Sequence, residues 1–273
     1  MSRSDSTLVA IGGGSSNPDI VDAFFDAFAE KRIARVAVLT VAAKKVNGMS
    51  TAYNSMFRKR NVNHVSMINI SSRKDAYSGA SLKKIEQADA IYFTGGDQLN
   101  ITSLFGGSPL DNLLHDKVKD GVVVGGTSAG ASMMGTSMIL DGTGDNSPES
   151  GGVEISSGLD LIKNSLIDTH FAQRGRHGRL LAALAHHPHL LYIGIDESTA
   201  AMVRGSQLRV VGDASVTIIS GSDVSHVDLV YRKEGDPISI FDVRLHVLAE
   251  GDSFDLKTRL PKARRAAFKT AGK

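Results

Sequence analysis

Residues 122–134 read Val-Val-Val-Gly-Gly-Thr-Ser-Ala-Gly-Ala-Ser-Met-Met, an apolar run followed by a glycine-rich turn and a helix-compatible segment. The turn holds the pattern Gly126-x-Ser128-x-Gly130, whose glycines allow neighbouring backbone to come close. A strand, a sharp turn and a helix around G-x-S-x-G form a nucleophile elbow in α/β proteins. The stretch therefore predicts a nucleophilic Ser128, with the Ala129 N–H facing the oxyanion. A glycine-rich phosphate-binding turn is the alternative reading.

The same strand–helix rhythm extends to both sides of this turn. Helical patterns occur at Ile20–Lys31, which opens with Asn17-Pro18, and at Ser81–Gln87 and Pro109–Lys119. Short apolar runs alternate with them, as expected for strands buried on both faces of a parallel sheet. The alternation predicts a three-layer α/β/α sandwich with a mostly parallel central sheet. The runs are Leu8–Ile11, Val36–Val41, Val65–Ile70, Ala90–Phe93, Val122–Val124, Leu166–Ile167 and Leu191–Ile195.

The pattern changes after residue 200, where short strand-like runs predict antiparallel β-hairpins. Residues 141–158 are rich in Gly, Ser and acidic residues and predict a long loop, which we interpret as a lid over a site. We expect one domain over residues 1–256 and a flexible basic tail over 257–273. The late runs are Ala200–Val203, Leu208–Val211, Val216–Ser220, Val227–Tyr231 and Ile238–Leu248.

Composition excludes several classes of protein. The chain has 273 residues, 41% hydrophobic and 22% charged, which is ordinary for a soluble globular protein. The absence of cysteine excludes disulfides, thiolate zinc sites and iron–sulfur clusters. No apolar run approaches the roughly 18–20 residues of a membrane span, and residues 1–14 lack the apolar core of a secretory signal. We therefore expect a cytoplasmic protein with no membrane partner.

The charge is uneven along the chain. Residues 257–273 hold seven of the 31 Lys and Arg residues and no acid, so the remainder has 24 basic against 29 acidic residues and a net charge of −5. A basic tail can contact nucleic acid or an acidic partner, although frayed solubilising termini are the plainer explanation. Trp is absent and Tyr and Phe are few, so we expect no nucleic-acid partner.

A nucleophilic serine needs a base and an orienting acid. His170 follows Leu166–Ile167, at the strand end where side chains of a parallel sheet converge. Asp196 and Glu197 follow Leu191–Ile195, and neighbouring strand residues face opposite sides, so only one of them can reach a given histidine. The residues alone leave that choice open. In the chain order of α/β-hydrolases, the base would instead be a later histidine, His226 or His246.

The cluster of His186, His187 and His189 has no carboxylate or thiolate at ligand spacing, so we predict no metal site there. Gly12-Gly13-Gly14 follows the first strand but lacks the third glycine and the acid of a dinucleotide-binding turn. We therefore expect no metal and no cofactor.

Arg174, Arg176 and Arg179 crowd the start of the helical segment Leu180–Ala185. Cations are disfavoured at a helix N-terminus, so three of them indicate binding of an anion such as a carboxylate. The alternative is pairing with Asp or Glu within the chain.

Phe93-Thr94-Gly95-Gly96 ends another strand of the same edge, and Asp97 and Gln98 follow it. These two side chains would cap the next helix or point into the site. A backbone N–H of the glycine pair, assigned to Gly96, would be the second donor to the oxyanion.

Four segments together resemble the cyanophycinase family: FTGGDQLNI (93–101), GGTSAGASMM (125–134), DTHFAQRGRHGRLL (168–181) and GIDESTA (194–200). The family is related to peptidase E and has a class I glutamine amidotransferase-like fold. Its members are cytoplasmic serine exopeptidases, typically homodimers. They degrade cyanophycin, a poly-aspartate backbone with arginine on each β-carboxyl, to β-Asp-Arg dipeptides without a metal or cofactor.

The resemblance implies that Ser128 is the nucleophile, His170 the base and Glu197 the orienting acid. Thr169 departs from the family pattern, which usually has Gln there, and this puts fine specificity in question. Other readings are a peptidase E-like dipeptidase acting on Asp-X or isoAsp-X, and a catalytically silent ligand-binding protein. The expected substrate-binding residues are Asp97, Gln98, Asp168, Thr169, Gln173, Arg174, Arg176 and Arg179.

Overall fold

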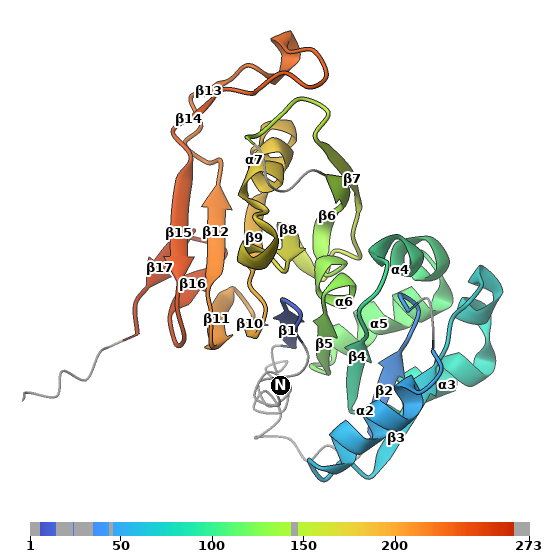
Figure 1. Ribbon diagram of the computed structural model, residues 1–273. Coiled ribbons are helices and arrows are strands. Elements are labelled where there is room, and N and C mark those ends of the chain that lie inside the picture. Colours follow the sequence, from blue (N-terminus) through green and yellow to red (C-terminus); the bar gives the residue numbers. More distant parts are fainter. Residues whose placement is uncertain (1–5, 15–23, 25–34, 44–45, 143–146, 265–273) are drawn as a thin grey trace, which may run out of the picture.

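The computed structural model describes residues 6–14, 24, 35–43, 46–142 and 147–264 (Figure 1). The helix expected over Ile20–Lys31 lies outside the described residues, apart from Phe24. The described strands divide between two large sheets and one short ribbon, where the sequence predicts a single central sheet. The protein is thus an α/β protein with mixed sheets. Apolar runs mark which segments become strands, but they carry no information on which sheet a strand joins.

The larger sheet has nine strands in the order β17-β16-β11-β10-β1-β5-β4-β2-β3. The half from β1 to β3 is parallel, and the half from β10 to β17 is antiparallel. The antiparallel half confirms the hairpins expected after residue 200. The strands are β1 (Thr7–Ile11), β2 (Arg35–Leu39), β3 (His64–Ile68), β4 (Ala90–Phe93), β5 (Val123–Thr127), β10 (Thr199–Arg204), β11 (Gln207–Gly212), β16 (Ser253–Asp255) and β17 (Leu260–Lys262).

The second sheet has six strands in the order β15-β12-β9-β8-β6-β7, with β6, β8 and β9 parallel to one another. A two-stranded ribbon, β13 (His226–Val227) with β14 (Ile240–Phe241), extends beyond it at the top of Figure 1. The six strands are β6 (Gly135–Gly142), β7 (Val153–Ser157), β8 (Ile162–Thr169), β9 (Leu191–Ile195), β12 (Val216–Ser220) and β15 (Arg244–Leu248).

Helices connect many of the strands, and local signals in the sequence fix where some of them begin. Helix α5 has the predicted bounds because Ser108 caps it, its hydroxyl accepting from Asp111 N at 3.3 Å, and because Pro109 occupies the first turn. The described helices are α2 (Met49–Arg58), α3 (Gly79–Glu86), α4 (Gln98–Phe105), α5 (Pro109–Lys119), α6 (Ala129–Ser132) and α7 (His177–His186), with short 3-10 turns η1 (Arg73–Tyr77), η2 (Ala172–Arg174) and η3 (Leu229–Tyr231).

The core lies on both faces of the nine-stranded sheet. Along β1, Leu8 and Ala10 join one buried cluster, whereas Val9 and Ile11 join another. The first cluster also contains residues of β9 and β12, so it joins one face of the six-stranded sheet to the larger sheet. Helix α7 covers the opposite face of the six-stranded sheet, where Leu180 and Leu184 are buried. Strand β1 is therefore buried on both sides, and its carboxyl end lies deep in the molecule.

Two expectations about irregular segments are wrong in part. Residues 141–158 are not one long loop, because β6 and β7 form an antiparallel hairpin that includes residues 141–142 and 153–157. The chain after residue 256 is not wholly a tail, because β17 pairs with β16. In both segments the backbone groups find partners in a neighbouring strand, which composition alone does not reveal.

Candidate active site

Ser128 stands at a strained turn between β5 and α6. Its φ of 53° and ψ of −115° are rare for a residue other than glycine. A Cβ on Gly126 would lie 2.1 Å from Gly130 O, and one on Gly130 would lie 2.5 Å from Phe93 O. Both glycines of the G-x-S-x-G pattern are therefore required by close backbone contacts. The Ser128 N–H donates to Ile11 O at 2.9 Å, which ties the turn to β1.

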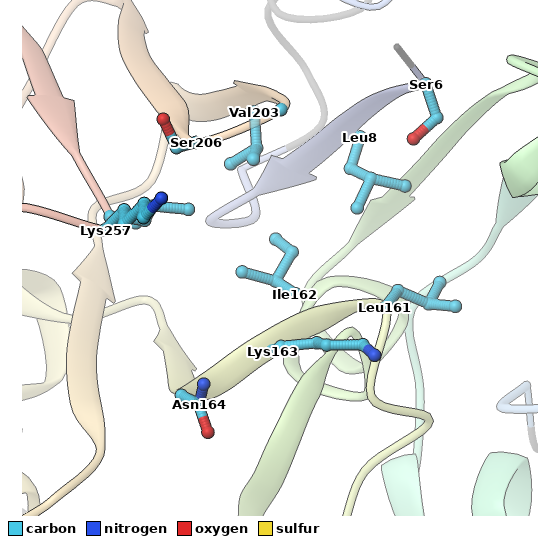
Figure 2. A pocket seen from close by; sticks show the side chains of 11 residues that line it. Ser6, Leu8, Leu161, Ile162, Lys163, Asn164, Val203, Ser206 and Lys257 are labelled. Atoms are coloured by element: carbon cyan, nitrogen blue, oxygen red, sulfur yellow. The ribbon is translucent and has the colours of Figure 1, made fainter. Parts of the chain in front are cut away.

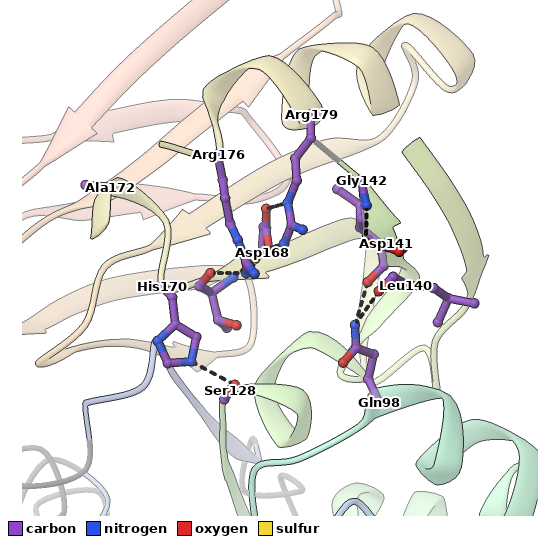
Figure 3. Close-up of polar contacts among 12 residues, drawn as sticks. Gln98, Ser128, Leu140, Asp141, Gly142, Asp168, His170, Ala172, Arg176 and Arg179 are labelled. Carbon is purple, nitrogen blue, oxygen red and sulfur yellow. Dashed lines mark hydrogen bonds and ion pairs between the residues drawn. The ribbon is translucent and has the colours of Figure 1, made fainter. Parts of the chain in front are cut away.

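A serine, a histidine and a glutamate form a continuous hydrogen-bonded chain. Ser128 Oγ lies 2.9 Å from His170 Nε2, and His170 Nδ1 lies 2.5 Å from Glu197 Oε1. The serine and the histidine, joined by a dashed line in Figure 3, come from the ends of β5 and β8. The histidine side chain is 14% exposed, so the site is accessible but largely shielded from water. This arrangement can transfer the hydroxyl proton to the imidazole while the carboxylate stabilises the imidazolium.

Asp196 and Glu197, which the sequence leaves as alternatives, have different surroundings. Asp196 is buried and accepts hydrogen bonds from Ala172 N at 2.9 Å and from Ser215 N and Oγ at 3.1 and 2.7 Å. Its carboxylate therefore holds two loops together. Glu197 is the residue that reaches His170.

The loop Gly12–Gly14 lies against this site, although its sequence pattern pointed to no function. His170 N donates to Gly12 O at 2.7 Å. A Cβ on Gly13 would lie 2.2 Å from His170 Cε1, and one on Gly14 would lie 3.0 Å from Glu197 Cβ. Because Gly13 has a φ of 112° and Gly14 a φ of 72°, glycine is needed for conformation as well as for space. The run of three glycines directly after the first buried strand was the signal in the sequence that could have revealed this role. Such a run indicates that the backbone there packs closely against another part of the protein.

The expected substrate-binding residues fall into two groups. Asp168, Arg176 and Arg179 form a buried ion cluster: the Asp168 carboxylate accepts from Arg179 Nε at 2.7 Å, from Arg179 Nη2, and from Arg176 Nη1 at 3.1 Å (Figure 3). Asp168 is 2% exposed and Arg179 is 7% exposed. For Arg176 and Arg179, the alternative interpretation of the arginines therefore applies, which is pairing with an acid within the chain.

The cluster carries two guanidinium groups and one carboxylate, so it keeps a net positive charge. Burial lowers the pKa of Arg176 to about 10, and the neighbouring charges of Arg179 and Arg174 act in the same direction, against the opposing effect of Asp168. Arg176 also donates to Thr169 O at 2.5 Å, one residue before His170. Arg174 is exposed, and its guanidinium forms no hydrogen bond or ion pair with another described residue.

Three further predicted residues are engaged in local structure. Asp97 caps α4, its Oδ1 accepting from Leu99 N at 3.0 Å. Gln98 Nε2 donates to Ile139 O at 2.7 Å, which attaches α4 to β6. Thr169 is 3% exposed, so its side chain does not line an open surface.

The remaining predicted positions lie at the edge of the site. Gln173 Oε1 accepts from Glu197 N at 2.9 Å and so fixes the backbone of the acid. A Cβ on Gly95 would lie 3.4 Å from Ser128 Cβ, which brings the Gly95–Gly96 turn beside the serine. Ala129 occupies the first position of α6, where helical N–H groups have no partner within the helix.

The other histidines are placed elsewhere. His226 stacks on Phe241 with ring centroids 4.7 Å apart, and His246 packs against Phe254 at 5.6 Å. No group of His, Asp or Glu within the described ranges could hold a metal ion. In the same part of the chain, no helix is long and apolar enough to cross a membrane.

A serine hydroxyl bonded to a histidine that is itself bonded to a carboxylate, on an elbow at the edge of an α/β sheet, is the arrangement that serine-type hydrolases use. The chain belongs to peptidase family S51, whose model matches residues 8–211. It is thus a serine-type peptidase.

Relatives of the chain carry a more specific name. The cyanophycinase of Synechococcus elongatus is 36% identical over 225 residues, which are 82% of this chain and 70% of the relative. That of Geminocystis herdmanii is 33% identical over 263 residues, 94% of this chain and 96% of the relative. Among solved structures, a peptidase from an acI-B1 Actinobacterium superposes with a TM-score of 0.69 at 22% identity, covering 93% of this chain and 98% of that one.

Proposed function

We propose that the chain is a cyanophycinase-like serine exopeptidase that releases β-Asp-Arg dipeptides from cyanophycin. The observation that carries the proposal is the hydrogen-bonded chain Ser128–His170–Glu197, together with relatives named cyanophycinase over most of the chain. The resemblance to that family also underlies a class I glutamine amidotransferase-like fold, a single domain over residues 1–256, a cytoplasmic location and a homodimer, which are parts of the same proposal.

The hydrogen bonds that link Ser128, His170 and Glu197 support the following acylation step. Ser128 gives its hydroxyl proton to His170 Nε2 as its oxygen attacks the carbonyl carbon of a backbone amide of the poly-aspartate chain. The N–H groups of Ala129 and Gly96 stabilise the oxyanion that forms. The carbon–nitrogen bond then breaks, and His170 returns the proton to the leaving amine.

Deacylation repeats these roles with water. His170 accepts a proton from the attacking water molecule, and the ester bond to Ser128 breaks as the serine oxygen takes the proton back. Glu197 keeps the imidazole oriented and stabilises its positive charge in both steps. The Gln173 side chain, which holds Glu197 N, acts through the acid and is a positioning residue.

The arginines divide between support and recognition. Arg179 and Asp168 are buried in their mutual pairing and shape the site without touching substrate. Arg174 and the unused N–H groups of Arg176 bind free carboxylates at the end of the polymer, which are the α-carboxylate of its terminal aspartate and those of its arginine residues, because a guanidinium offers five donors in a planar fork. The two arginines beside the site support a peptide with free carboxylates as the substrate class.

The test is to incubate the full chain with insoluble cyanophycin and to identify the soluble product by mass spectrometry. We expect β-Asp-Arg, and at least a roughly thousandfold loss of turnover in Ser128→Ala and in His170→Ala. His246→Ala is the matched control and keeps full activity. Loss in His246→Ala with activity in His170→Ala would support the α/β-hydrolase order instead. Cleavage of Asp-X or isoAsp-X dipeptides without release from cyanophycin would overturn the substrate and make the chain a dipeptidase.

A further inference from the structure

Strand β8 begins beside a pocket and ends at the base of the hydrogen-bonded triad. Ile162, at its start, lines the pocket together with Leu8 of β1 (Figure 2). The pocket therefore lies at the amino end of β8, whereas His170 follows its carboxyl end. Because β9 is parallel to β8, Asp196 and Glu197 follow the carboxyl end of β9 at the same edge of the sheet. Both acids are thus placed beside the turn that carries the base.

The carboxylate of Asp196 reaches the loops on both sides of β9. Its neighbours in the sheet are β8 and β12. After β8, Ala172 N donates to Asp196 Oδ1 at 2.9 Å. Before β12, Ser215 donates to Asp196 Oδ2 from its N at 3.1 Å and from its Oγ at 2.7 Å. One side chain therefore joins the ends of three neighbouring strands.

The backbone at His170 needs such support. Its φ of 50° lies in the left-handed region, which is unfavourable for a residue other than glycine. Ala172, two residues later, opens the 3-10 turn η2, and an N–H at the start of such a turn has no partner within it. Asp196 Oδ1 accepts from this N–H. The carboxylate therefore fixes the turn that sets the direction of the imidazole.

Asp196 fixes the acid as well as the base. It is 4% exposed, and its N–H donates to Ser215 O at 3.2 Å, so both its side chain and its backbone are held. Glu197 follows it directly, and the Glu197 side chain is 38% exposed, so little packing surrounds that carboxylate. The distance of 2.5 Å between Glu197 Oε1 and His170 Nδ1 therefore depends on how firmly the backbone before Glu197 is held.

We propose that Asp196 is a positioning residue, which holds the base and the acid in place without touching the substrate or the reacting atoms. Its partners among the described residues are two backbone N–H groups and one hydroxyl, with no cation. A buried carboxylate is costly unless such hydrogen bonds are complete, so each of them is needed. The inference rests on the proposed function, since it takes Ser128, His170 and Glu197 as the catalytic residues.

Asp196→Asn tests the proposal, because asparagine has one acceptor oxygen where aspartate has two. Either Ala172 N or the two donors of Ser215 would then face an NH2 group. We expect kcat for release of β-Asp-Arg to fall about a hundredfold, the effect of a misplacement of about 1 Å, while KM stays within about twofold.

Asp228→Asn is the matched control. Asp228 is 8% exposed and accepts from Ser239 N at 2.8 Å, so it is also a buried carboxylate that holds a loop. It lies beside the ribbon of β13 and β14, away from the triad. We expect this variant to unfold at a lower urea concentration than the wild type and to keep its kcat.

Proton NMR provides a readout that needs no substrate. The proton between His170 Nδ1 and Glu197 Oε1, which lie 2.5 Å apart, should resonate far downfield of the backbone amides. Its loss in His170→Ala identifies it. We expect the signal to move upfield or to broaden in Asp196→Asn and to stay unchanged in Asp228→Asn. A wild type that shows the signal but releases nothing from cyanophycin would refute the proposed substrate, and the signal would still test the role of Asp196.

Ser215→Ala gives a milder variant that remains informative if Asp196→Asn does not fold. It removes the Oγ donor to the carboxylate, and we expect kcat to fall about three- to tenfold, as for one lost hydrogen bond. Because Ser215 acts through Asp196, the double variant should be no slower than Asp196→Asn alone.

Several outcomes would overturn the proposal. One is a kcat and an NMR signal in Asp196→Asn that match those of the wild type, or the same result in Ser215→Ala. Another is an equal loss of kcat in Asp228→Asn, which would make the effect one of general stability. Additive losses in the double variant would show that Ser215 does not act through Asp196.

Discussion

Individual residues hold this site together through backbone contacts as much as through side chains. Gly13 illustrates the point, since its α-carbon faces the imidazole of His170 with no room for a methyl group. The substitution Gly13→Ala would push the ring away from Ser128 Oγ. Because a misplacement of about 1 Å can lower a rate about a hundredfold, we expect kcat on the proposed substrate to fall by at least that factor.

Gly48→Ala is the matched control for this change. Gly48 also has a positive φ, of 80°, but a Cβ there would meet nothing within 4 Å. It therefore carries the conformational strain without the clash, and activity should persist. Full activity in Gly13→Ala would show that the glycine loop does not set the position of the base.

The buried carboxylate of Asp168 leads to a second prediction, which concerns the free energy of unfolding. Its carboxylate is the acceptor for two guanidinium groups, one of which belongs to the buried Arg179. Removing one partner of a buried pair costs about 3–5 kcal/mol, since the other charge stays buried and uncompensated. We expect Asp168→Asn to lower the free energy of unfolding in urea by that amount.

The exposed pair of Asp223 and Arg244 provides the comparison. Their side chains are 48% and 42% exposed, so Asp223→Asn should change the free energy of unfolding by no more than about 1 kcal/mol. Similar losses in the two variants would mean that the buried cluster contributes no more than a surface ion pair.

The residue scale also shows what could be read from the sequence and what could not. Ser128 was predictable because the G-x-S-x-G turn has local steric requirements that leave a local pattern. Glu197 was not separable from Asp196, since the direction of a side chain at a strand end depends on the loops that receive it. The role of Gly12–Gly14 was hidden because its contacts are with residues more than 150 positions away in the chain.

At the scale of elements, capping decides where helices begin. The Ser108 hydroxyl accepts from the backbone of α5, whereas Ser78 precedes α3 without a side-chain cap. Loss of a cap costs about 1 kcal/mol. We therefore expect Ser108→Ala to lower the free energy of unfolding by about that amount and Ser78→Ala to leave it nearly unchanged. Equal effects in urea denaturation would contradict this account of the bounds of α5.

The histidines at the end of α7 lead to a prediction about how the stability of the fold depends on pH. Partial burial lowers the pKa of His187, and the neighbouring His186 and His189 lower it further. The unfolded chain then binds more protons than the folded one as pH falls below the ordinary pKa of 6.5, so folding is destabilised on the acid side. We expect His187→Gln to reduce the loss of urea midpoint between about pH 7.5 and 5.

Helices and strands were predicted well where neighbouring residues in the sequence determine them, and poorly where pairing with a distant strand determines them. Pro109–Lys119 has a cap, a first-turn proline and a periodic apolar face, and its bounds agree with those expected. The β6–β7 hairpin carries Gly, Ser and acid, which usually mark a loop, and its strands are held by pairing with each other and with β8. Such pairing depends on partners that composition does not identify.

At the scale of the whole molecule, the basic C-terminal region helps to join the two sheets. Arg259 lies between β16 and β17 of the nine-stranded sheet, and it donates to Ser220 Oγ at 2.9 Å and to His189 O at 2.6 Å. Ser220 ends β12 of the six-stranded sheet, so one guanidinium bridges the two sheets. A segment expected to be a flexible tail thus begins with a structural contact.

Removing that contact tests the arrangement of the sheets. Hydrogen bonds to a charged group contribute roughly 1.5–3 kcal/mol, so we expect Arg259→Met to lower the free energy of unfolding by a value in that range. Lys257→Met, two residues earlier, removes the same charge from a side chain without such a bond, and should change it by less than about 0.5 kcal/mol. If both variants unfold at the same urea concentration as the wild type, the sheets are held by the shared apolar core alone, and the basic region contributes charge without structure. If only Arg259→Met is destabilised, the contact of Arg259 with Ser220 and His189 adds to the stability that the shared apolar core provides.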